Sequence, residues 1–175
     1  RNCCGKNKCL VITAQKLMSV VVKIWKTYRR PIRTYSNLFA SGPSEKQNLA
    51  YLMGGCLLYF ISSWPFQARK AFEDQIPLEG LISGTLISAL FVAPLGFYLI
   101  SIVFHILAKA LGSKTSGVEI RLILFWAFLA IAPLMLLRGL VAGFFDMKFQ
   151  YSIVSGLCLS VLVLFIYSGF KGLSR

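Results

Sequence analysis

The chain has 175 residues, of which 57% are hydrophobic and only 14% are charged. Ordinary soluble domains carry about 25% charged residues, so this composition points to another class of protein. The 19 lysines and arginines outnumber the 6 acidic residues and produce a formal net charge of +13. So many apolar residues exclude an intrinsically disordered chain, and their arrangement in long uncharged blocks argues against a soluble globular domain.

Residues 1–17 lack the apolar stretch and the small-residue cleavage site of a signal peptide. Met18 opens a stretch that is typical of a translation start, so we expect residues 1–17 to be a non-native or mis-started extension. Cys3, Cys4 and Cys9 have no fourth Cys or His nearby, and a structural zinc site usually takes four ligands. No metal site is therefore predicted, and attachment of a lipid to Cys3 or Cys4 requires that this stretch is translated.

The N-terminal arm, residues 18–48, combines basic residues with aliphatic and aromatic ones. Its candidate lipid- or partner-binding residues are Lys23, Lys26, Arg29, Arg30 and Arg33. A basic segment with an apolar side is typical of a helix that lies in a membrane interface, and Pro31 is expected to bound it. We therefore predict that the arm binds anionic lipid headgroups; the alternative is a solvated arm without membrane contact. Ser44, which follows turn-forming residues, is expected to cap the next helix.

Four blocks of the sequence are long and apolar enough to cross a membrane, because the hydrocarbon core requires about 20 apolar residues per helix. They cover about residues 49–66, 80–108, 122–145 and 151–170, and Arg138 is the only charged residue that interrupts them. The predicted fold class is all-α: a polytopic transmembrane helical bundle of four spans, with five as the alternative. The segments outside the spans alternate between basic and neutral or acidic, which predicts that both termini are cytoplasmic.

Pro94 and Pro133 lie near the middle of the second and third predicted spans, each within an Ala-Pro-Leu triplet. A proline inside a span frees a backbone carbonyl and kinks the helix. Paired kinks of this kind also occur in the broken helices of transporters. A transporter would need a polar cavity at these prolines, and the nearby polar candidates are Ser88, Tyr98 and Ser101. Packing kinks without transport are the interpretation we favour.

Two ionisable residues are candidates for polar groups inside the membrane. Arg138 lies towards the outer end of its span, where its long stem can reach the headgroups or pair with Asp146. His105 lies one turn before Lys109, near the inner surface, and no acidic residue lies at a similar depth. We therefore predict that His105 is interfacial rather than part of a proton relay.

Small residues at a spacing of four indicate close helix packing in two places. These pairs are Gly80 with Gly84 and Gly139 with Gly143. Such pairs let two helix backbones approach each other. The spacing does not separate packing within one chain from packing between two copies.

The chain contains no enzyme motif, no paired carboxylates within a span and a single histidine. We predict a protein that is not an enzyme and has no cofactor. The basic segments lack the aromatic pattern of a nucleic-acid surface, so nucleic acid is not an expected partner either.

Short motifs occur in three stretches of the chain. They are Glu45, Leu52-Met53, Trp64-Pro65 and Ala68-Arg69; then Ala93-Pro94-Leu95, Tyr98, His105 to Gly112 and Lys114; then Arg121 to Ala127, Ala132-Pro133-Leu134, Gly139-Leu140 and Gly143. Together they resemble the short bacterial branch of the Yip-domain family, whose eukaryotic relatives interact with Ypt/Rab GTPases. The resemblance covers roughly residues 18–169, and the stretch from His105 to Gly112 is among its most specific parts.

The resemblance implies a small polytopic protein of the bacterial inner membrane with a cytoplasmic N-terminus. Rab binding is not carried over, because those features lie in long N-terminal regions and this arm is short. We predict a non-enzymatic protein of membrane organisation or of protein and lipid interaction; a small transporter or channel is the alternative. A membrane-protein partner and a second copy of the chain are both left open as partners.

Overall fold

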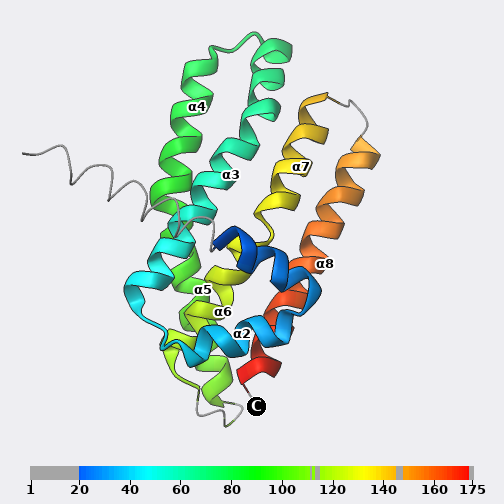
Figure 1. Ribbon diagram of the computed structural model, residues 1–175. Helices are drawn as coiled ribbons and strands as arrows, with labels where there is room; N and C mark the ends of the chain where they lie inside the picture. The colour runs from blue at the N-terminus through cyan, green and yellow to red at the C-terminus, as the bar shows by residue number, and fades with distance from the viewer. Residues whose placement is uncertain (1–19, 111, 113–114, 145–147, 174–175) are drawn as a thin grey trace, which may run out of the picture.

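The computed structural model describes residues 20–110, 112, 115–144 and 148–173, and the side chains of these residues except 148–151. All regular elements in these ranges are helices, as the apolar blocks predicted. A helix over residues 20–29 precedes those labelled in Figure 1, which are α2 (Pro31–Ala40), α3 (Glu45–Asp74), α4 (Leu78–Ile87), the π-helical turn η1 (Ser88–Val92), α5 (Ala93–Ala110), α6 (Gly117–Ala130), α7 (Ala132–Phe144) and α8 (Lys148–Leu173).

Three helices are long and apolar enough to cross a membrane. They are α3, the continuous helix Leu78–Ala110 formed by α4, η1 and α5, and Ser152–Leu173 of α8. The first two contain the predicted spans 49–66 and 80–108 and extend beyond them, and the third covers all but the first residue of the predicted span 151–170. Large apolar side chains cover the outward faces of these helices: Phe91 is 71% exposed, and Leu95 and Leu159 are each 65% exposed. Soluble proteins rarely expose such continuous apolar surface, so these helices indicate an integral membrane protein.

The third predicted span, residues 122–145, is formed by two helices rather than one. α6 ends at Ala130, α7 begins at Ala132, and their axes are bent by 42°. Taken together, the two helices are also long and apolar enough to cross a membrane. Pro133 lies in the first turn of α7, where a helix requires no N–H donor. The helix break therefore lies just before the proline.

Pro94 has a different local effect from Pro133. It follows η1, in which the N–H of Ala93 bonds to the carbonyl of Ser88, five residues earlier. A π turn of this kind changes the hydrogen-bond register locally without ending the helix. The helix consequently continues from Leu78 to Ala110.

α6 forms the centre of the bundle. Every residue from Leu122 to Ala130 is buried, and an evenly apolar circumference is typical of a helix that protein surrounds. α3, α5 and α8 pack against it, while the arm covers a further side, as Figure 1 shows.

Two glycines bring α7 into direct contact with α3. A Cβ atom at Gly139 would lie 1.8 Å from the carbonyl oxygen of Ser62, and one at Gly143 would lie 2.5 Å from the Cβ of Pro65. This pair of small residues therefore packs within one chain. At Gly80 and Gly84, by contrast, an added Cβ would meet no atom within 4 Å.

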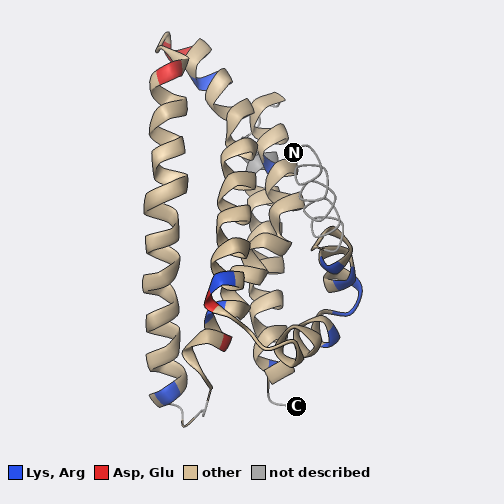
Figure 2. Cartoon of the chain, turned by 60° about the vertical axis from the view of Figure 1, so that its left-hand side comes forward, with Lys and Arg blue, Asp and Glu red and all other residues tan. Residues whose placement is uncertain are grey.

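The arm and the end of α8 lie at the same end of the bundle. The position of Gly172 lies against Tyr35 and Ile32 of α2. Figure 2 shows basic residues along the arm and acidic residues at the turn between α3 and α4, at the opposite end. Those acidic residues are Glu73, Asp74 and Glu79.

The helix boundary predicted at Pro31 and the helix cap predicted at Ser44 are confirmed. The first helix ends at residue 29, and Pro31 begins α2. Ser44 caps α3, where its side-chain oxygen accepts a hydrogen bond from the N–H of Gln47 at 3.3 Å.

Candidate functional site

The helix over residues 20–29 is held against α6 by two side-chain hydrogen bonds. The Nε1 of Trp126 donates to the Oγ1 of Thr27 at 3.2 Å, and this hydroxyl in turn donates to the carbonyl of Lys23. The hydroxyl of Tyr28 donates to the carbonyl of Ala130 at 3.0 Å. Ala130 is the last residue of α6, so the arm supplies a donor to a carbonyl at the helix break.

α2 continues this contact towards the end of the bundle. The buried hydroxyl of Tyr35 donates to the carbonyl of Ile123 at 3.4 Å. Burial raises the pKa of Tyr35 well above its ordinary value. The arm is therefore packed on the bundle by one side, a contact that the sequence analysis did not predict.

The other side of the arm carries the predicted basic residues. Lys26, Arg29, Arg30 and Arg33 are exposed, and Lys23 is half-buried. Two large apolar side chains are exposed beside them: Val21 by 62% and Trp25 by 64%. The guanidinium of Arg29 lies over the ring of Trp25, 5.7 Å from its centroid. The exposed side of the arm thus combines cations with apolar and aromatic groups.

Residues from all three motif stretches meet where α3, α5 and α6 come together. The carboxylate of Glu45 forms an ion pair with Arg121, whose guanidinium lies 5.6 Å from the ring centroid of Tyr98. Beside them, the buried Asn48 donates from Nδ2 to the carbonyl of Val118 at 3.0 Å. These contacts join the starts of α3 and α6 to α5.

His105 lies at the same junction. Its ring is within 3.8 Å of the Cβ position of Gly117, the first residue of α6. Its Nδ1 atom is buried and has no hydrogen-bond partner among the described residues. Because α6 begins here, His105 lies towards the arm end of the bundle, the end at which the sequence analysis expected it.

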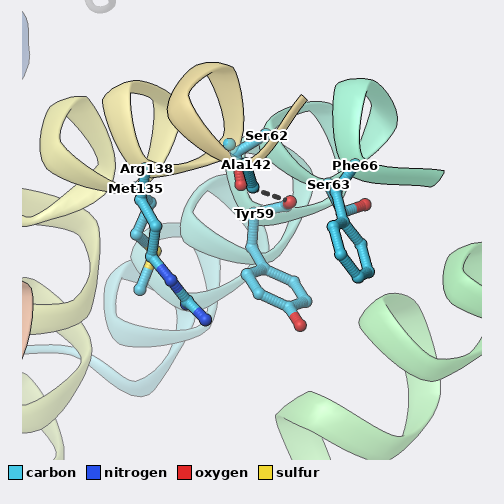
Figure 3. Close-up of a pocket in the computed structure, with 8 residues that line it drawn as sticks. Tyr59, Ser62, Ser63, Phe66, Met135, Arg138 and Ala142 are labelled. Carbon is cyan, nitrogen blue, oxygen red and sulfur yellow. Dashed lines mark hydrogen bonds between the residues drawn. The ribbon is translucent and has the colours of Figure 1, made fainter. Parts of the chain in front are cut away.

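Arg138 lines a cavity of about 150 Å³ between α3 and α7. Figure 3 shows Arg138 and Tyr59 extending in the same direction from these two helices. Further lining residues are Ser62, Ser63, Phe66 and Met135. The predicted partner Asp146 lies outside the described residues.

The residues suggested for a transport cavity do not line this one. Ser88 is exposed, and Pro133 is exposed as well. Ser101 is buried and donates to the carbonyl of Tyr98 within the same helix at 2.7 Å. Pro94 is half-buried.

Among the residues that the structure describes, no three His, Cys, Asp or Glu side chains are grouped so that they could hold a metal ion. Cys3, Cys4 and Cys9 lie outside the described residues. Cys56 and Cys158 are buried free thiols in α3 and α8.

No protein-family model, no curated protein and no solved structure matches this chain.

Proposed function

We propose that this chain is a non-enzymatic protein of the bacterial inner membrane that organises lipids or a protein partner at the cytoplasmic surface. The observation that carries the proposal is the two-sided arm. One side is bonded to the buried helix α6, and the other presents four exposed basic residues beside exposed Val21 and Trp25. Basic residues beside apolar ones are suited to the boundary between anionic headgroups and acyl chains.

In this proposal the chain has four spans, with α6 and α7 together forming the third. The bend would then lie inside the membrane, and both termini would be cytoplasmic. The distribution of charge supports this orientation: the arm end holds most of the basic side chains, whereas at the opposite end Glu73, Asp74 and Glu79 outnumber Arg69 and Lys70.

Membership of the Yip-domain family, as a short bacterial branch, is part of the same proposal. Its support is that Arg121 contacts both Glu45 and Tyr98, so that three separate motif stretches meet at this residue. His105 adjoins them at the start of α6. These residues join helices to each other, so the motifs would serve the fold of the bundle rather than a catalytic step.

A small transporter or channel remains the second candidate. The observation that favours it is irregular backbone in two spans, at η1 before Pro94 and at the break before Pro133. Discontinuous helices of this kind surround the substrate sites of some transporters. Uptake of a solute by vesicles containing the protein, abolished by a change at either proline, would favour transport over the lipid-binding proposal.

The lipid proposal is tested with the full-length protein in nanodiscs of mixed zwitterionic and anionic phospholipid. The arm variant is Lys26→Gln with Arg29→Gln and Arg33→Gln. Each basic residue near an anionic surface contributes about 1 kcal/mol, so we expect the anionic enrichment around the protein to fall about tenfold or more. The measurement is the ratio of anionic to zwitterionic lipid that co-purifies, at low and at high salt.

A matched control removes the same charge at the same end of the bundle but outside the two helices of residues 20–40 that carry the basic residues: Lys46→Gln with Lys109→Gln and Lys171→Gln. Equal losses in both variants would show that general charge, and not the basic side of these two helices, selects the lipid. Enrichment that is insensitive to salt and unchanged in the arm variant would overturn the electrostatic account.

A further inference from the structure

Three arginines lie close together at the point where the first helix of the arm ends and α2 begins. They are Arg29, Arg30 and Arg33, and all three are exposed. Arg30 joins the two helices, and its carbonyl accepts a hydrogen bond from the N–H of Thr34 at 3.2 Å. Arg30 and Arg33 are therefore one helical turn apart, and Arg29 directly precedes them. Like charges at this spacing repel one another and destabilise a helix.

This arginine cluster has no counter-ion in the part of the chain that the structure describes. None of its three side chains forms an ion pair with a described residue. The acidic residues at the starts of α3 and α6 are engaged elsewhere. Glu45 pairs with Arg121, and Glu119 accepts a hydrogen bond from the N–H of Ser116 at 2.8 Å. The positive charge of the cluster is consequently left for an anion from outside the chain.

Trp25 sets the depth at which the cluster would meet a membrane. Its indole is exposed, and an amphipathic ring of this kind prefers the headgroup level of a bilayer. The guanidinium of Arg29 lies over the ring of Trp25. A cation–π contact uses the charge of the guanidinium and needs none of its hydrogen-bond donors. With Trp25 at the headgroups, the free donors of Arg29 would lie at the level of the phosphates.

The residue type in the cluster indicates the kind of anion. Arginine presents a planar fork of donors that pairs with phosphate through two parallel hydrogen bonds, whereas lysine acts as a point charge. Three such forks offer more donors than the two free oxygens of a phosphodiester can accept. A phosphomonoester has three free oxygens and carries a charge of about −1.5 to −2 at neutral pH. It is therefore the phosphate that best matches the number and the charge of the three arginines.

We propose that the arginine cluster selects lipids whose headgroup is a phosphomonoester, such as phosphatidate, over lipids whose headgroup is a phosphodiester. Arg29, Arg30 and Arg33 donate hydrogen bonds to the phosphate oxygens, while the apolar side chains of Val21 and Trp25 enter the bilayer beside them. These apolar side chains favour a lipid over a soluble phosphate. The inference rests on the proposed function, because it names the lipid class that the arm selects.

The test uses the full-length protein in nanodiscs that contain zwitterionic phospholipid together with phosphatidate and phosphatidylglycerol. The two anionic lipids are mixed at about one to two, so that each contributes a similar total charge. The measurement is the ratio of phosphatidate to phosphatidylglycerol that stays bound after the disc is dissolved in mild detergent, relative to the ratio supplied. We expect phosphatidate to be enriched about tenfold, the effect of one additional charge-assisted hydrogen bond.

The deciding variant is Arg29→Lys with Arg30→Lys and Arg33→Lys, which keeps every positive charge and removes the donor forks. We expect this lysine variant to retain the excess of anionic over zwitterionic lipid and to lose the preference for phosphatidate. The three positions are exposed, so the exchange leaves the core intact, and gel filtration with a thermal melt establishes that the variant is folded.

A matched control adds Lys46→Arg and Lys109→Arg to the lysine variant. These positions are exposed at the same end of the bundle but outside the cluster, so the preference should not return. An equal retention of the two anionic lipids by the wild-type protein would overturn the proposal. A preference that survives in the lysine variant, or that returns in the control, would overturn it as well.

Glycerol 3-phosphate distinguishes the two sources of a phosphomonoester. At millimolar concentration it should leave the bound phosphatidate in place, because it lacks the acyl chains that contact Val21 and Trp25. Displacement would show that the cluster binds a soluble phosphomonoester instead of a lipid. Failure of this inference is also distinguishable from failure of the proposed function: the latter fails if anionic lipid as a whole is not enriched over zwitterionic lipid, whatever the ratio of the two anionic lipids.

Discussion

At the scale of single residues, the absence of a side chain determines how α3 and α7 pack. Gly139 lies so close to the backbone of Ser62 that no Cβ atom fits between them, whereas Gly84 on α4 meets nothing within 4 Å. The two glycines are indistinguishable by sequence spacing, because each belongs to a pair separated by four residues. Their different surroundings lead to opposite expectations for the same substitution.

We expect Gly139→Ala to lower the stability of the protein in detergent by about 3 kcal/mol or more, because α7 must move away from α3. Gly84→Ala is the matched control and should be neutral or stabilising by up to about 1 kcal/mol, since alanine is the better helix former. Thermal melts of both variants provide the comparison. Equal melting temperatures for the two would contradict the close contact between α3 and α7.

The sequence predicted the roles of single residues correctly where the geometry of one helical turn determines them. It did not predict them where a partner from a distant part of the chain determines whether a residue is buried. The cap at Ser44 and the boundary at Pro31 follow from the geometry of one helical turn. Thr27 and Asn48, in contrast, are polar residues that became buried because Trp126 and Val118 bond to them from far along the chain. Nothing in their immediate neighbourhood distinguishes them from exposed polar residues.

At the scale of the helices, packing holds the bend between α6 and α7. α7 is fixed to α3 by Gly139 and Gly143, and the end of α6 is bonded to Tyr28 of the arm. Both helices are therefore constrained independently of Pro133. The proline lies in the first turn of α7, where its ring is compatible with a straight continuation of that helix.

We consequently expect Pro133→Ala to leave the bend in place and to reduce stability by only about 0.4–1 kcal/mol, through the greater freedom of the unfolded chain. Spin labels at the exposed positions of Ser36 on α2 and Phe144 on α7 report the bend as a distance. If the bend fell by half, the far end of α7 would move by about 7 Å. A shift of that size in the distance between the labels of Pro133→Ala would show that the proline alone maintains the bend. Gly139→Ala serves as the positive control, because α7 is expected to move in that variant.

At the scale of the whole molecule, the arm belongs to the bundle and is not merely attached to it. Thr27, Tyr28 and Tyr35 bond to one side of α6, and the ring of Tyr28 packs edge-on against Phe165 of α8 with centroids 5.2 Å apart. Without the arm, the centre of the bundle would be open on that side. The arm thus connects the surface that we propose binds lipid with the core.

We expect deletion of residues 1–43 to expose Cys158, which neighbours Tyr28, while Cys56 stays buried in α3. The two cysteines are the only ones left in the shortened chain. Their rates of alkylation in detergent are the measurement, with a full-length chain lacking Cys3, Cys4 and Cys9 as the reference. The rate at Cys158 should rise about tenfold or more, because opening of the arm no longer has to precede the reaction.

An unchanged rate at Cys158 would contradict the placement of the arm over α6 and α8. A parallel rise at Cys56 would show that the arm is needed for the whole bundle to fold, and the local covering role would then be wrong. The ratio of the two alkylation rates therefore distinguishes an arm that only covers α6 and α8 from an arm that the whole bundle needs in order to fold.

The sequence by itself determined the class of this protein and the course of most of its helices. A span requires about 20 neighbouring apolar residues, so it is a property of local composition that can be counted along the chain. Three uncharged blocks predicted helices that are long and apolar enough to cross a membrane. A fourth block, interrupted only by Arg138, is divided by the structure into α6 and α7. The concentration of basic residues in the arm was visible in the same way.

Only the tertiary structure decided which helix is central, what covers it and which residues meet. α6 is no more apolar than the exposed α5, yet protein surrounds α6 and leaves most of α5 uncovered. Glu45 and Arg121 pair across 76 positions of sequence, and Arg138 shares a cavity with Tyr59 from another helix. In a membrane protein the lipid-facing and buried surfaces are both apolar, because lipid and protein interior are similar solvents for such side chains. Hydropathy therefore identifies the helices but not their neighbours, which follow from shape and from hydrogen bonds between distant parts of the chain.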